Sequence, residues 1–372
     1  MIKVCYIIGT LEIGGAEKQL LKLVKNIDRR RFLPVVIALR GGALKEEFEK
    51  VVKLIVIGKR WKIDPFFLFR LISVIKKEKT YILHTFMFTS NTWGRIAGII
   101  AGIPVLIASE RCVDIWKRWY HKLIDKILLM FTYKVIGNSN AVKKFYQETE
   151  GIPDNKITVI YNGIDLEEFQ NIEPCKIEIE KKGGLVGTGG RFTEQKGLIY
   201  LLMAIPEVLK VFPDTKFIFV GNGPLRRSFE DFVKSHKISD SVIFTGYRKD
   251  ILSIFSLCDV IVVPSLFEGM PNIVLEAMAL KKPVIGTNIP EIAELIEDGK
   301  NGFLVPVKDN VKDIAEKIIS LLKNPDMRKD MGEKGYNLIK ENFSLEKMIK
   351  RYETLYIETL QEKDKICVPY VE

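Results

Sequence analysis

Two glutamates, Glu268 and Glu276, stand eight positions apart in an otherwise apolar stretch of the second half of the chain. Pro271 lies between them, where it suits the first position of a helix, so Glu276 falls on a helix whose other residues are mostly apolar. A buried carboxylate is costly unless donors satisfy it, and a vicinal diol would supply two hydrogen bonds. The backbone N–H groups that open this helix could hold a phosphate. This segment comprises Gly269, Met270, Pro271 and Asn272, and all of these except Pro271 carry a backbone N–H. The simpler alternative is that Glu276 pairs with a structural cation and Glu268 occupies an ordinary turn.

Two glycine loops each follow a predicted strand and precede a predicted helix. Gly14 and Gly15 form the first loop, and Gly190 leads into Arg191 and Lys196 in the second. Glycine lets backbone N–H groups approach an anion at a helix N-terminus, and two cations at the mouth of a loop suit a diphosphate. An ordinary turn in the first loop and a surface ion pair in the second are the competing interpretations.

Other cofactor and metal motifs fail on spacing. The G-x-G-x-x-G motif fails at its third glycine in two places: Phe192 stands there after Gly187 and Gly189, and Arg226 stands there after Gly221 and Gly223. A nicotinamide cofactor is therefore not indicated. No G-x-x-x-x-G-K-[ST] occurs, which excludes a P-loop NTPase. The five cysteines form no C-x-x-C pair, so neither a zinc ribbon nor a disulfide framework is expected, and a reducing compartment is favoured.

The pair of glutamates resembles the signature of the family 4 glycosyltransferases, a glutamate followed by seven residues and a second glutamate. Further blocks are similar to that family in the same order along the chain: Gly14 to Glu17, Tyr161 to Asp165, Gly190 to Gly197, Phe219 to Pro224, Phe244 to Arg248 and Asn301 to Val305. The resemblance implies a retaining enzyme of the GT-B fold that uses a nucleotide sugar.

The resemblance also implies a role for each matching residue. Glu276 would hold the ribose hydroxyls of the donor, and Glu268 would lie at the hydroxyls of the transferred sugar. Arg191 and Lys196 would neutralise the diphosphate leaving group, so no metal and no other cofactor would be required. The remaining donor contacts would come from the glycine loops, the start of the helix after Pro271 and a loop at the nucleobase, which comprises Gly246, Tyr247 and Arg248.

The chain departs from the family at one position. Many relatives place a histidine near the donor sugar after a strand of the first domain, but here the strand Val105 to Ala108 leads into Ser109-Glu110-Arg111. His84, at the end of the preceding predicted strand, is the remaining candidate for a catalytic contact. A single histidine at a strand end is more often structural.

Predicted strands alternate with helical patterns throughout, which is typical of an α/β protein with parallel sheets covered on both faces. We expect two Rossmann-like, doubly wound domains facing across a cleft. The first would comprise residues 1–165, followed by a polar linker over 166–182 and a nucleotide-sugar-binding domain over 183–343. Residues 344–372 would form a C-terminal helix that packs back toward the N-terminal domain.

The charge of the chain is concentrated in its first part. Residues 1–165 carry 28 Lys and Arg against 15 Asp and Glu, whereas the whole chain has a net charge of +10. Aromatic, apolar and basic residues mix between Arg111 and Lys134, and Phe66 to Arg70 is a smaller cluster of the same kind. This pattern favours an interfacial helix on an anionic membrane, although aromatics facing the core and lysines facing water would give the same sequence.

We therefore expect a cytoplasmic, peripheral enzyme at the inner face of the cell membrane. Its substrates would be a nucleotide sugar, most readily a UDP-sugar, and a lipid-linked or polysaccharide acceptor. Nucleic acid is not an expected partner, because no recognition motif accompanies the basic residues. Two alternatives remain open: a sugar-nucleotide epimerase on the same scaffold, and a non-catalytic paralogue that binds nucleotide sugars.

Overall fold

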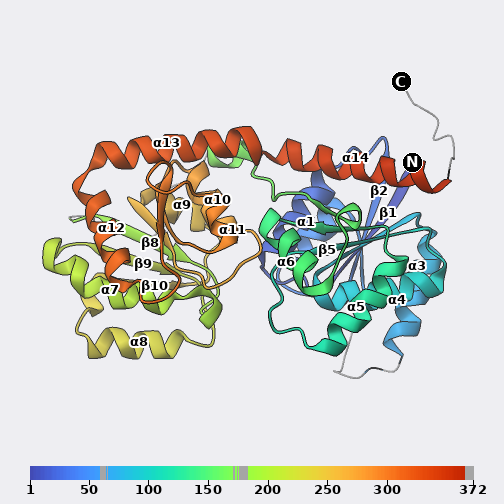
Figure 1. Cartoon of the computed structure of the whole chain (residues 1–372), viewed down its shortest axis with the longest axis horizontal. Helices are drawn as coiled ribbons and strands as arrows, with labels where there is room; N and C mark the ends of the chain where they lie inside the picture. The colour runs from blue at the N-terminus through green and yellow to red at the C-terminus, as the bar shows by residue number, and fades with distance from the viewer. Residues whose placement is uncertain (59–63, 65, 171, 174, 176–182, 365–372) are drawn as a thin grey trace. The chain divides into compact units, whose positions relative to one another are not determined.

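The computed structural model describes residues 1–58, 64, 66–170, 172–173, 175 and 183–364 (Figure 1). These residues form two compact units. One unit contains Met1–Gly163 together with the segment that begins at Leu345, and the other contains Ile164–Ser344. Residues 171, 174 and 176–182 of the expected linker lie outside the described residues, and its first part forms a short 3₁₀ turn, Leu166–Phe169.

The first unit is built on a parallel sheet of seven strands in the order β3-β2-β1-β4-β5-β6-β7. The strands are β1 (Ile2–Ile8), β2 (Phe32–Ala38), β3 (Lys53–Val56), β4 (Ile82–Phe86), β5 (Val105–Glu110), β6 (Lys134–Gly137) and β7 (Ile157–Val159). The helices are α1 (Gly15–Asn26), α2 (Lys45–Val51), α3 (Phe67–Glu78), α4 (Met87–Ala101), α5 (Trp119–Phe131), α6 (Asn140–Glu150) and α14 (Leu345–Asp364). The central strands are apolar on both faces because helices cover both sides.

Helix α14 belongs to the first unit although it comes from the end of the chain. It packs against α1, and its tyrosines Tyr352 and Tyr356 are buried in the same apolar cluster as Tyr6 of β1. Val24 and Ile27 of α1 contribute to this cluster as well. One face of the first sheet is therefore closed by a segment distant in sequence.

The second unit repeats the architecture with a parallel sheet of six strands in the order β10-β9-β8-β11-β12-β13. The strands are β8 (Leu185–Gly189), β9 (Lys216–Val220), β10 (Val242–Gly246), β11 (Val260–Val263), β12 (Val284–Thr287) and β13 (Gly302–Val305). The helices are α7 (Leu198–Val211), α8 (Arg226–Ser235), α9 (Ile251–Leu257), α10 (Asn272–Ala279), α11 (Pro290–Ala293), α12 (Val311–Lys323) and α13 (Pro325–Asn342). The prediction of two doubly wound α/β domains is confirmed.

Each sheet has a point where the order of strands reverses, and ligands of open α/β sheets bind outside the carboxyl ends of the strands there. In the first unit this point lies between β1 and β4, and in the second between β8 and β11. The glycine loop of residues 9–15 leaves β1, whereas the loop of residues 190–197 leaves β8 and that of residues 264–271 leaves β11. The topology thus places the loops that carry the candidate site residues at the carboxyl edges of the two sheets.

Candidate active site

In the second unit, the loops after β8 and β11 are joined to each other by hydrogen bonds. The backbone N–H of Leu266 donates to the carbonyl of Gln195 at 2.8 Å, and the side-chain amide of Gln195 donates to the carbonyl of Phe267 at 3.0 Å. Gly197 has φ +57°, and a Cβ on it would lie 2.0 Å from the carbonyl oxygen of Pro264. Only glycine permits this approach, so the sequence fixes the two loops side by side.

This junction places Lys196 against Glu268. The ammonium of Lys196 donates to Oε1 of Glu268 at 2.5 Å, and the hydroxyl of Ser265 donates to the same oxygen at 2.7 Å. Glu268 is buried, whereas the side chain of Lys196 keeps 23% of its surface exposed. A lysine ammonium has three donors, so Lys196 can hold Glu268 and still direct a proton toward a second anion.

Gly190 gives Lys196 its place at the end of β8. Its φ of +134° excludes a side chain, and the aliphatic stem of Lys196 lies about 3.5 Å from where a Cβ would be. Arg191, next in the chain, is exposed, and among the described residues no carboxylate lies within ion-pair distance of it. The loop therefore presents one cation held by a buried carboxylate and one cation that reaches solvent.

Glu291 is a second buried carboxylate beside this pair, and sequence reasoning missed it. It lies in the first turn of α11 and is 5% exposed. The pKa of Glu291 is raised to about 7, mainly by burial; a backbone hydrogen bond opposes this shift, and the charge of Glu268 adds to it. Thr287, at the end of β12, donates to the carbonyl of Ser265 and connects the two segments. In the sequence, the only local indication of this carboxylate was the pair Pro290-Glu291 after an apolar strand.

Glu276 lies one helical segment beyond Glu268, on α10. The helix begins at Asn272, with Pro271 in the N-cap position rather than in the first helical position, a difference of one residue. Glu276 is half-buried, while its neighbours Leu275 and Ala277 are fully buried. Met270 and Pro271 are buried at the start of the helix. The sequence-based expectation of a carboxylate on a largely core-facing helix thus matches the position of Glu276.

The expected nucleobase loop follows β10. The backbone N–H of Gly221 donates to the carbonyl of Gly246 at 2.8 Å, which brings the loops after β9 and β10 together. Tyr247 is half exposed, and Arg248 makes two hydrogen bonds with Asp250 at 2.7 and 2.6 Å. The arginine is therefore held in place, and the tyrosine ring beside it offers a surface on which a base could stack.

In the first unit, the glycine loop opens α1 as expected. Gly14 is the N-cap of this helix, and Glu17 in its first turn accepts a hydrogen bond from Thr10 at 3.2 Å. A Cβ on Gly14 would lie 2.3 Å from a carboxylate oxygen of Glu17, so a side chain there would displace the glutamate. The N-terminus of α1 is consequently shared between an acidic side chain and any anion that binds there.

His84 is placed differently from a residue that contacts substrate. It is fully buried in β4, and its two ring nitrogens lie 2.7 Å from the hydroxyl of Tyr356 and 2.8 Å from that of Ser109. Burial, with a smaller contribution from Arg111, holds the pKa of His84 well below its usual value. The geometry supports the structural interpretation of His84, because the ring is neutral and both nitrogens are occupied by side chains of its own unit.

Residues 13–168 match the family described as Glycosyltransferase Family 4, and residues 170–338 match the family described as Glycosyl transferases group 1. The chain belongs to the family 4 glycosyltransferases.

Two relatives of this glycosyltransferase are similar over most of their length. The UDP-Gal:alpha-D-GlcNAc-diphosphoundecaprenol alpha-1,3-galactosyltransferase of Escherichia coli is 29% identical over 313 residues, which cover 80% of each chain. The capsular polysaccharide biosynthesis glycosyltransferase CapM of Staphylococcus aureus is 26% identical over 80% of this chain and 82% of its own.

Solved structures establish that the glycosyltransferase has the GT-B fold. Anabaena HepE, in complex with UDP and glucose, superposes with a TM-score of 0.83 at 20% identity, over 96% of this chain and all of that chain. A glycosyltransferase from Rickettsia africae gives a TM-score of 0.83 at 23% identity, over 97% of this chain and 99% of its own.

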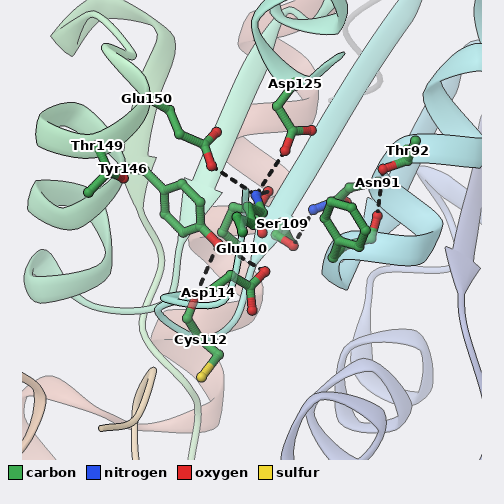
Figure 2. A network of polar contacts seen from close by, with 12 residues as sticks. Asn91, Thr92, Ser109, Glu110, Cys112, Asp114, Asp125, Tyr146, Thr149 and Glu150 are labelled. Carbon is green, nitrogen blue, oxygen red and sulfur yellow. Dashed lines mark hydrogen bonds and ion pairs between the residues drawn. The ribbon is translucent and has the colours of Figure 1, made fainter. Parts of the chain in front are cut away.

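The first unit of the glycosyltransferase contains a second cluster of charged residues, which is almost fully enclosed (Figure 2). The ammonium of Lys117 donates to Asp125 and to Glu150, each at 2.9 Å, and lies 4.0 Å from Glu110. Figure 2 shows Asp125 and Glu150 pointing toward this common centre from two sides. Arg95 adds a hydrogen bond to Asp125. The charged side chains of this cluster are therefore paired with one another, and solvent hardly reaches them.

Burial and charge act against each other in this cluster. Burial alone would lower the pKa of Lys117, but the three carboxylates around it raise the pKa above its usual value. Burial raises the pKa of Glu150 to about 7 and raises the pKa of Glu110 as well, against the opposing effect of Lys117. Lys117 lies in the stretch between Arg111 and Lys134 that was expected to form an interfacial helix, and for this residue the expectation is wrong: its side chain is fully buried and pairs with these acids.

The helix that follows, α5, nevertheless exposes a continuous apolar face. At helical spacing, a group of large apolar side chains is 39 to 77% exposed: Trp119, Tyr120, Leu123, Ile124, Ile127, Met130 and Phe131. Ile115 and Trp116 extend the face before the helix, and Lys122 and Lys126 lie along one of its flanks. No described helix is both long enough and apolar enough to cross a membrane. We call this surface, formed by Ile115, Trp116 and the exposed apolar side chains of α5, the α5 face.

Proposed function

We propose that the enzyme transfers a sugar from a UDP-sugar to a lipid-linked or polysaccharide acceptor in the synthesis of cell-surface glycans, with retention of the anomeric configuration and without a metal ion. The observation that carries the proposal is the Lys196–Glu268 pair at the reversal point of the second sheet. The names of relatives support it: one uses UDP-Gal and a diphosphoundecaprenol acceptor, and another acts in capsular polysaccharide biosynthesis. UDP in the HepE structure supports the choice of nucleotide.

Lys196 would stabilise the charge that develops on the departing phosphate. Its ammonium is already oriented by Glu268, so little rearrangement is needed when the bond between sugar and phosphate breaks. Arg191, exposed on the same loop, would bind the diphosphate as a second cation. Together they would replace the metal that other transferases use to neutralise this group.

Glu268 would accept hydrogen bonds from the hydroxyls of the transferred sugar through the carboxylate oxygen that Lys196 and Ser265 do not occupy. Glu276 would hold the ribose hydroxyls, and Tyr247 and Arg248 would border the base. The α10 N-terminus would add backbone donors for a phosphate oxygen. In the first unit, Gly14 and Gly15 would border an anionic group of the substrates at the start of α1, a position shared with Glu17.

The α5 face would dock the enzyme on the inner face of the membrane. Exposed tryptophans beside a stripe of aliphatic side chains, with lysines along the flank, are what an interfacial helix needs to enter the headgroup region of an anionic bilayer. Such an apolar surface is unusual for a face that contacts only water. A lipid-linked acceptor would then be presented to an enzyme that is already on the same surface.

The first experiment is a thermal-shift series with UDP, GDP, ADP and their sugar conjugates, with and without EDTA. A shift with UDP and one UDP-sugar that EDTA does not change is the expected result, because specific binding stabilises the folded state. Transfer to a diphosphate-linked lipid acceptor would follow, with the anomeric configuration read by NMR. Release of an altered nucleotide sugar without acceptor, or an inverted product, would contradict the proposal.

Membrane docking is tested by sedimentation with vesicles of phosphatidylcholine alone and with phosphatidylglycerol added. The variant Trp119→Ser/Leu123→Ser/Ile127→Ser should lose binding to the anionic vesicles at low salt. A matched control, Met203→Ser/Val211→Ser, changes exposed apolar residues of the second unit and should bind as the wild type does. Equal binding of both variants would rule out the α5 face as the docking surface.

A further inference from the structure

A buried cation lies at the carboxyl edge of the first sheet. Arg111 directly follows β5 and is 8% exposed. Its guanidinium donates to the amide oxygen of Asn162 at 2.5 Å and to the hydroxyl of Tyr352 at 3.4 Å. Both partners are neutral, and no carboxylate of the described residues lies within ion-pair distance of this guanidinium. A buried charge is costly unless an opposite charge or a full set of hydrogen bonds compensates it.

The acids nearest to Arg111 in sequence are engaged with other partners. Glu110 faces the enclosed cluster, where the ammonium of Lys117 lies 4.0 Å from it. Asp114 accepts a hydrogen bond from the hydroxyl of Tyr146 at 3.2 Å. Successive side chains along an extended chain point to opposite faces, so Arg111 lies on the side of α14 and Glu110 on the side of α4 and α5. The charge of Arg111 therefore has no counter-ion from its own segment.

The guanidinium of Arg111 keeps donors for a ligand. It carries five N–H groups, and its Nε is buried with no hydrogen-bond partner among the described residues. Nε and an adjacent terminal nitrogen form the planar fork that binds two oxygens of a phosphate or carboxylate. Asn162 and Tyr352 hold the group from the other nitrogens, and the ring centroid of Phe86 lies 6.0 Å from its central carbon. Arg111 is thus oriented in advance to bind an oxyanion.

Further buried polar atoms at this edge have no partner within the part of the chain that the structure describes. Asn138, directly after β6, donates its side-chain amide to the carbonyl of Arg111 at 3.2 Å, but its side-chain oxygen accepts no hydrogen bond. The hydroxyl of Ser90, in the first turn of α4, is unsatisfied as well. Its neighbour Asn91 donates to the carbonyl of Ser109 at 3.0 Å, which joins this turn to the end of β5 (Figure 2). Buried groups of this kind require an explanation, and here they follow three adjacent strands at the edge where such sheets bind ligands.

We propose that Arg111 binds a phosphate of the diphosphate that links the acceptor sugar to its lipid. The inference rests on the lipid-linked acceptor of the proposed function. Arg111 stands four residues before Ile115, the first residue of the α5 face, so their Cα atoms lie at most about 14 Å apart. A docked α5 face therefore brings Arg111 within reach of a diphosphate at the membrane surface. Asn138 and Ser90 add hydrogen-bonding groups for the sugar that the diphosphate carries.

The test measures the binding of geranyl diphosphate, a water-soluble lipid diphosphate, by calorimetric titration of the full chain. Saturating UDP is present, so that the proposed donor site is occupied. The wild type should bind the probe, and Arg111→Gln should bind it at least about tenfold more weakly, because hydrogen bonds from a charged group are lost. Arg118→Gln, which removes an exposed arginine of the same segment, should bind the probe as the wild type does.

A second variant and a second measurement separate ligand binding from a structural role of Arg111. Arg111→Lys keeps the charge but lacks the planar fork, so it should also bind geranyl diphosphate more weakly, and it serves if Arg111→Gln does not fold. Geranyl diphosphate should raise the melting temperature of the wild type and of Arg118→Gln but not that of Arg111→Gln, because only binding to the folded state stabilises it. A purely structural arginine would leave this ligand-dependent shift intact.

Several outcomes would overturn the proposal. Equal affinity of the wild type, Arg111→Gln and Arg111→Lys for geranyl diphosphate would show that Arg111 does not hold the phosphate. Weaker binding of UDP in Arg111→Gln, with binding of geranyl diphosphate unchanged or absent, would assign the arginine to the donor. Inorganic diphosphate that binds as tightly as the probe would reduce the site to a general anion site. Geraniol that binds as tightly would show that only the hydrocarbon chain is recognised.

Failure of this proposal can be distinguished from failure of the proposed function. Sugar transfer to a diphosphate-linked lipid is measured on the same variants, and Arg111→Gln should raise the Michaelis constant for this acceptor but not that for the UDP-sugar. If the wild type transfers sugar to the lipid and Arg111→Gln has an unchanged Michaelis constant for it, only the assignment of Arg111 is wrong. If the wild type uses no diphosphate-linked acceptor and yet binds geranyl diphosphate through Arg111, the proposed acceptor is wrong and the anion site stands.

Discussion

Lys117 and Lys196 are two lysines paired with glutamate at the carboxyl edges of similar sheets, but they differ in enclosure. Lys117 is fully buried and is surrounded by three carboxylates and two aromatic rings, those of Phe88 and Tyr146. Lys196 is 23% exposed and, within the part of the chain that the structure describes, forms an ion pair with Glu268 alone. Pairing between the same residue types is therefore compatible with ligand binding only where the cation stays accessible to solvent, as Lys196 does.

The enclosed cluster also has a consequence for the α5 face. Lys117 lies directly before the helix, between the exposed Trp116 and Trp119. Its bonds to Asp125 on α5 and Glu150 on α6 tie the segment to two helices. The hydrogen bonds of the buried Lys117 therefore hold this segment in place while Trp116 and Trp119, on either side of it in sequence, face solvent.

The comparison predicts the largest change in stability for Lys117→Met. This variant removes the partner of several buried carboxylates, and breaking a buried ion pair in this way costs about 3–5 kcal/mol. Lys196→Met, the matched variant in the second unit, should lower the free energy of unfolding by less, because Lys196 is partly exposed and Ser265 still donates to Glu268. Chemical unfolding of both variants checks this, and an equal loss in both would remove the distinction.

The second prediction reverses the ranking for activity. Lys196→Met should reduce turnover about 10²–10³-fold, the size of effect seen when one preorganised donor to a developing negative charge is removed. The Michaelis constant for the donor should change less than turnover. Steady-state kinetics checks this at a temperature where the variant is folded. A loss confined to the Michaelis constant would assign Lys196 to ground-state binding.

Glu276→Gln should give a smaller effect, on donor affinity. Hydrogen bonds to a charged group contribute about 1.5–3 kcal/mol, so UDP affinity should fall roughly 10- to 150-fold. Calorimetric titration with UDP measures this, and uridine-free competitors such as inorganic diphosphate should bind with unchanged affinity. If UDP affinity were unaffected, the assignment of Glu276 to the ribose would fail.

The smallest expected effect concerns pH and compares Glu150 with Glu291. The pKa of each is raised from 4.5 to about 7, so the folded state binds the proton more tightly than the unfolded state. Each group therefore contributes stability that is fully present below pH 4.5 and is lost as pH rises toward and through 7. Glu150→Gln and Glu291→Gln should each flatten the stability profile in this window, as measured by thermal unfolding.

The two variants should differ in their activity profiles. Glu291 lies close enough to Glu268 for their charges to interact, whereas the cluster around Glu150 is in the other unit. Only Glu291→Gln should shift the pH dependence of kcat/KM. A shift of similar size in Glu150→Gln would indicate that the enclosed cluster influences the reaction.

Much of the fold could be predicted from the sequence because buried parallel strands leave a strong pattern. Short β-branched runs such as Val260 to Val263 appear as strands, and the helix expected over residues 344–372 appears as Leu345–Asp364, with residues 365–372 outside the described part of the chain. The contact between Lys196 and Glu268 also follows from the topology, since the loops that carry them leave neighbouring strands at the same edge. These are consequences of local pattern and sheet order.

The remaining features depend on tertiary packing, which spacing does not reveal. Lys117 stands in a run of aromatic and basic residues, and only the fold shows that acids on α5 and α6 surround it. His84 has the same neighbours in sequence whether it faces a ligand or Tyr356, a residue 272 positions away. Glu291 has no local signal of its burial beside Glu268. Whether a charged side chain is enclosed is decided by distant segments.

The closure of the first unit by α14 affects how the chain is made. The ribosome completes the first 163 residues and then the whole second unit before it reaches Leu345. Synthesis proceeds at about 5–20 residues per second. The apolar surface formed by Val24, Ile27 and Tyr6 therefore stays uncovered for roughly 10 to 40 seconds, until Tyr352 and Tyr356 are made. During that interval the nascent chain carries an open hydrophobic groove. A chain that stops before Leu345 keeps this groove permanently and becomes a substrate for chaperones and proteases.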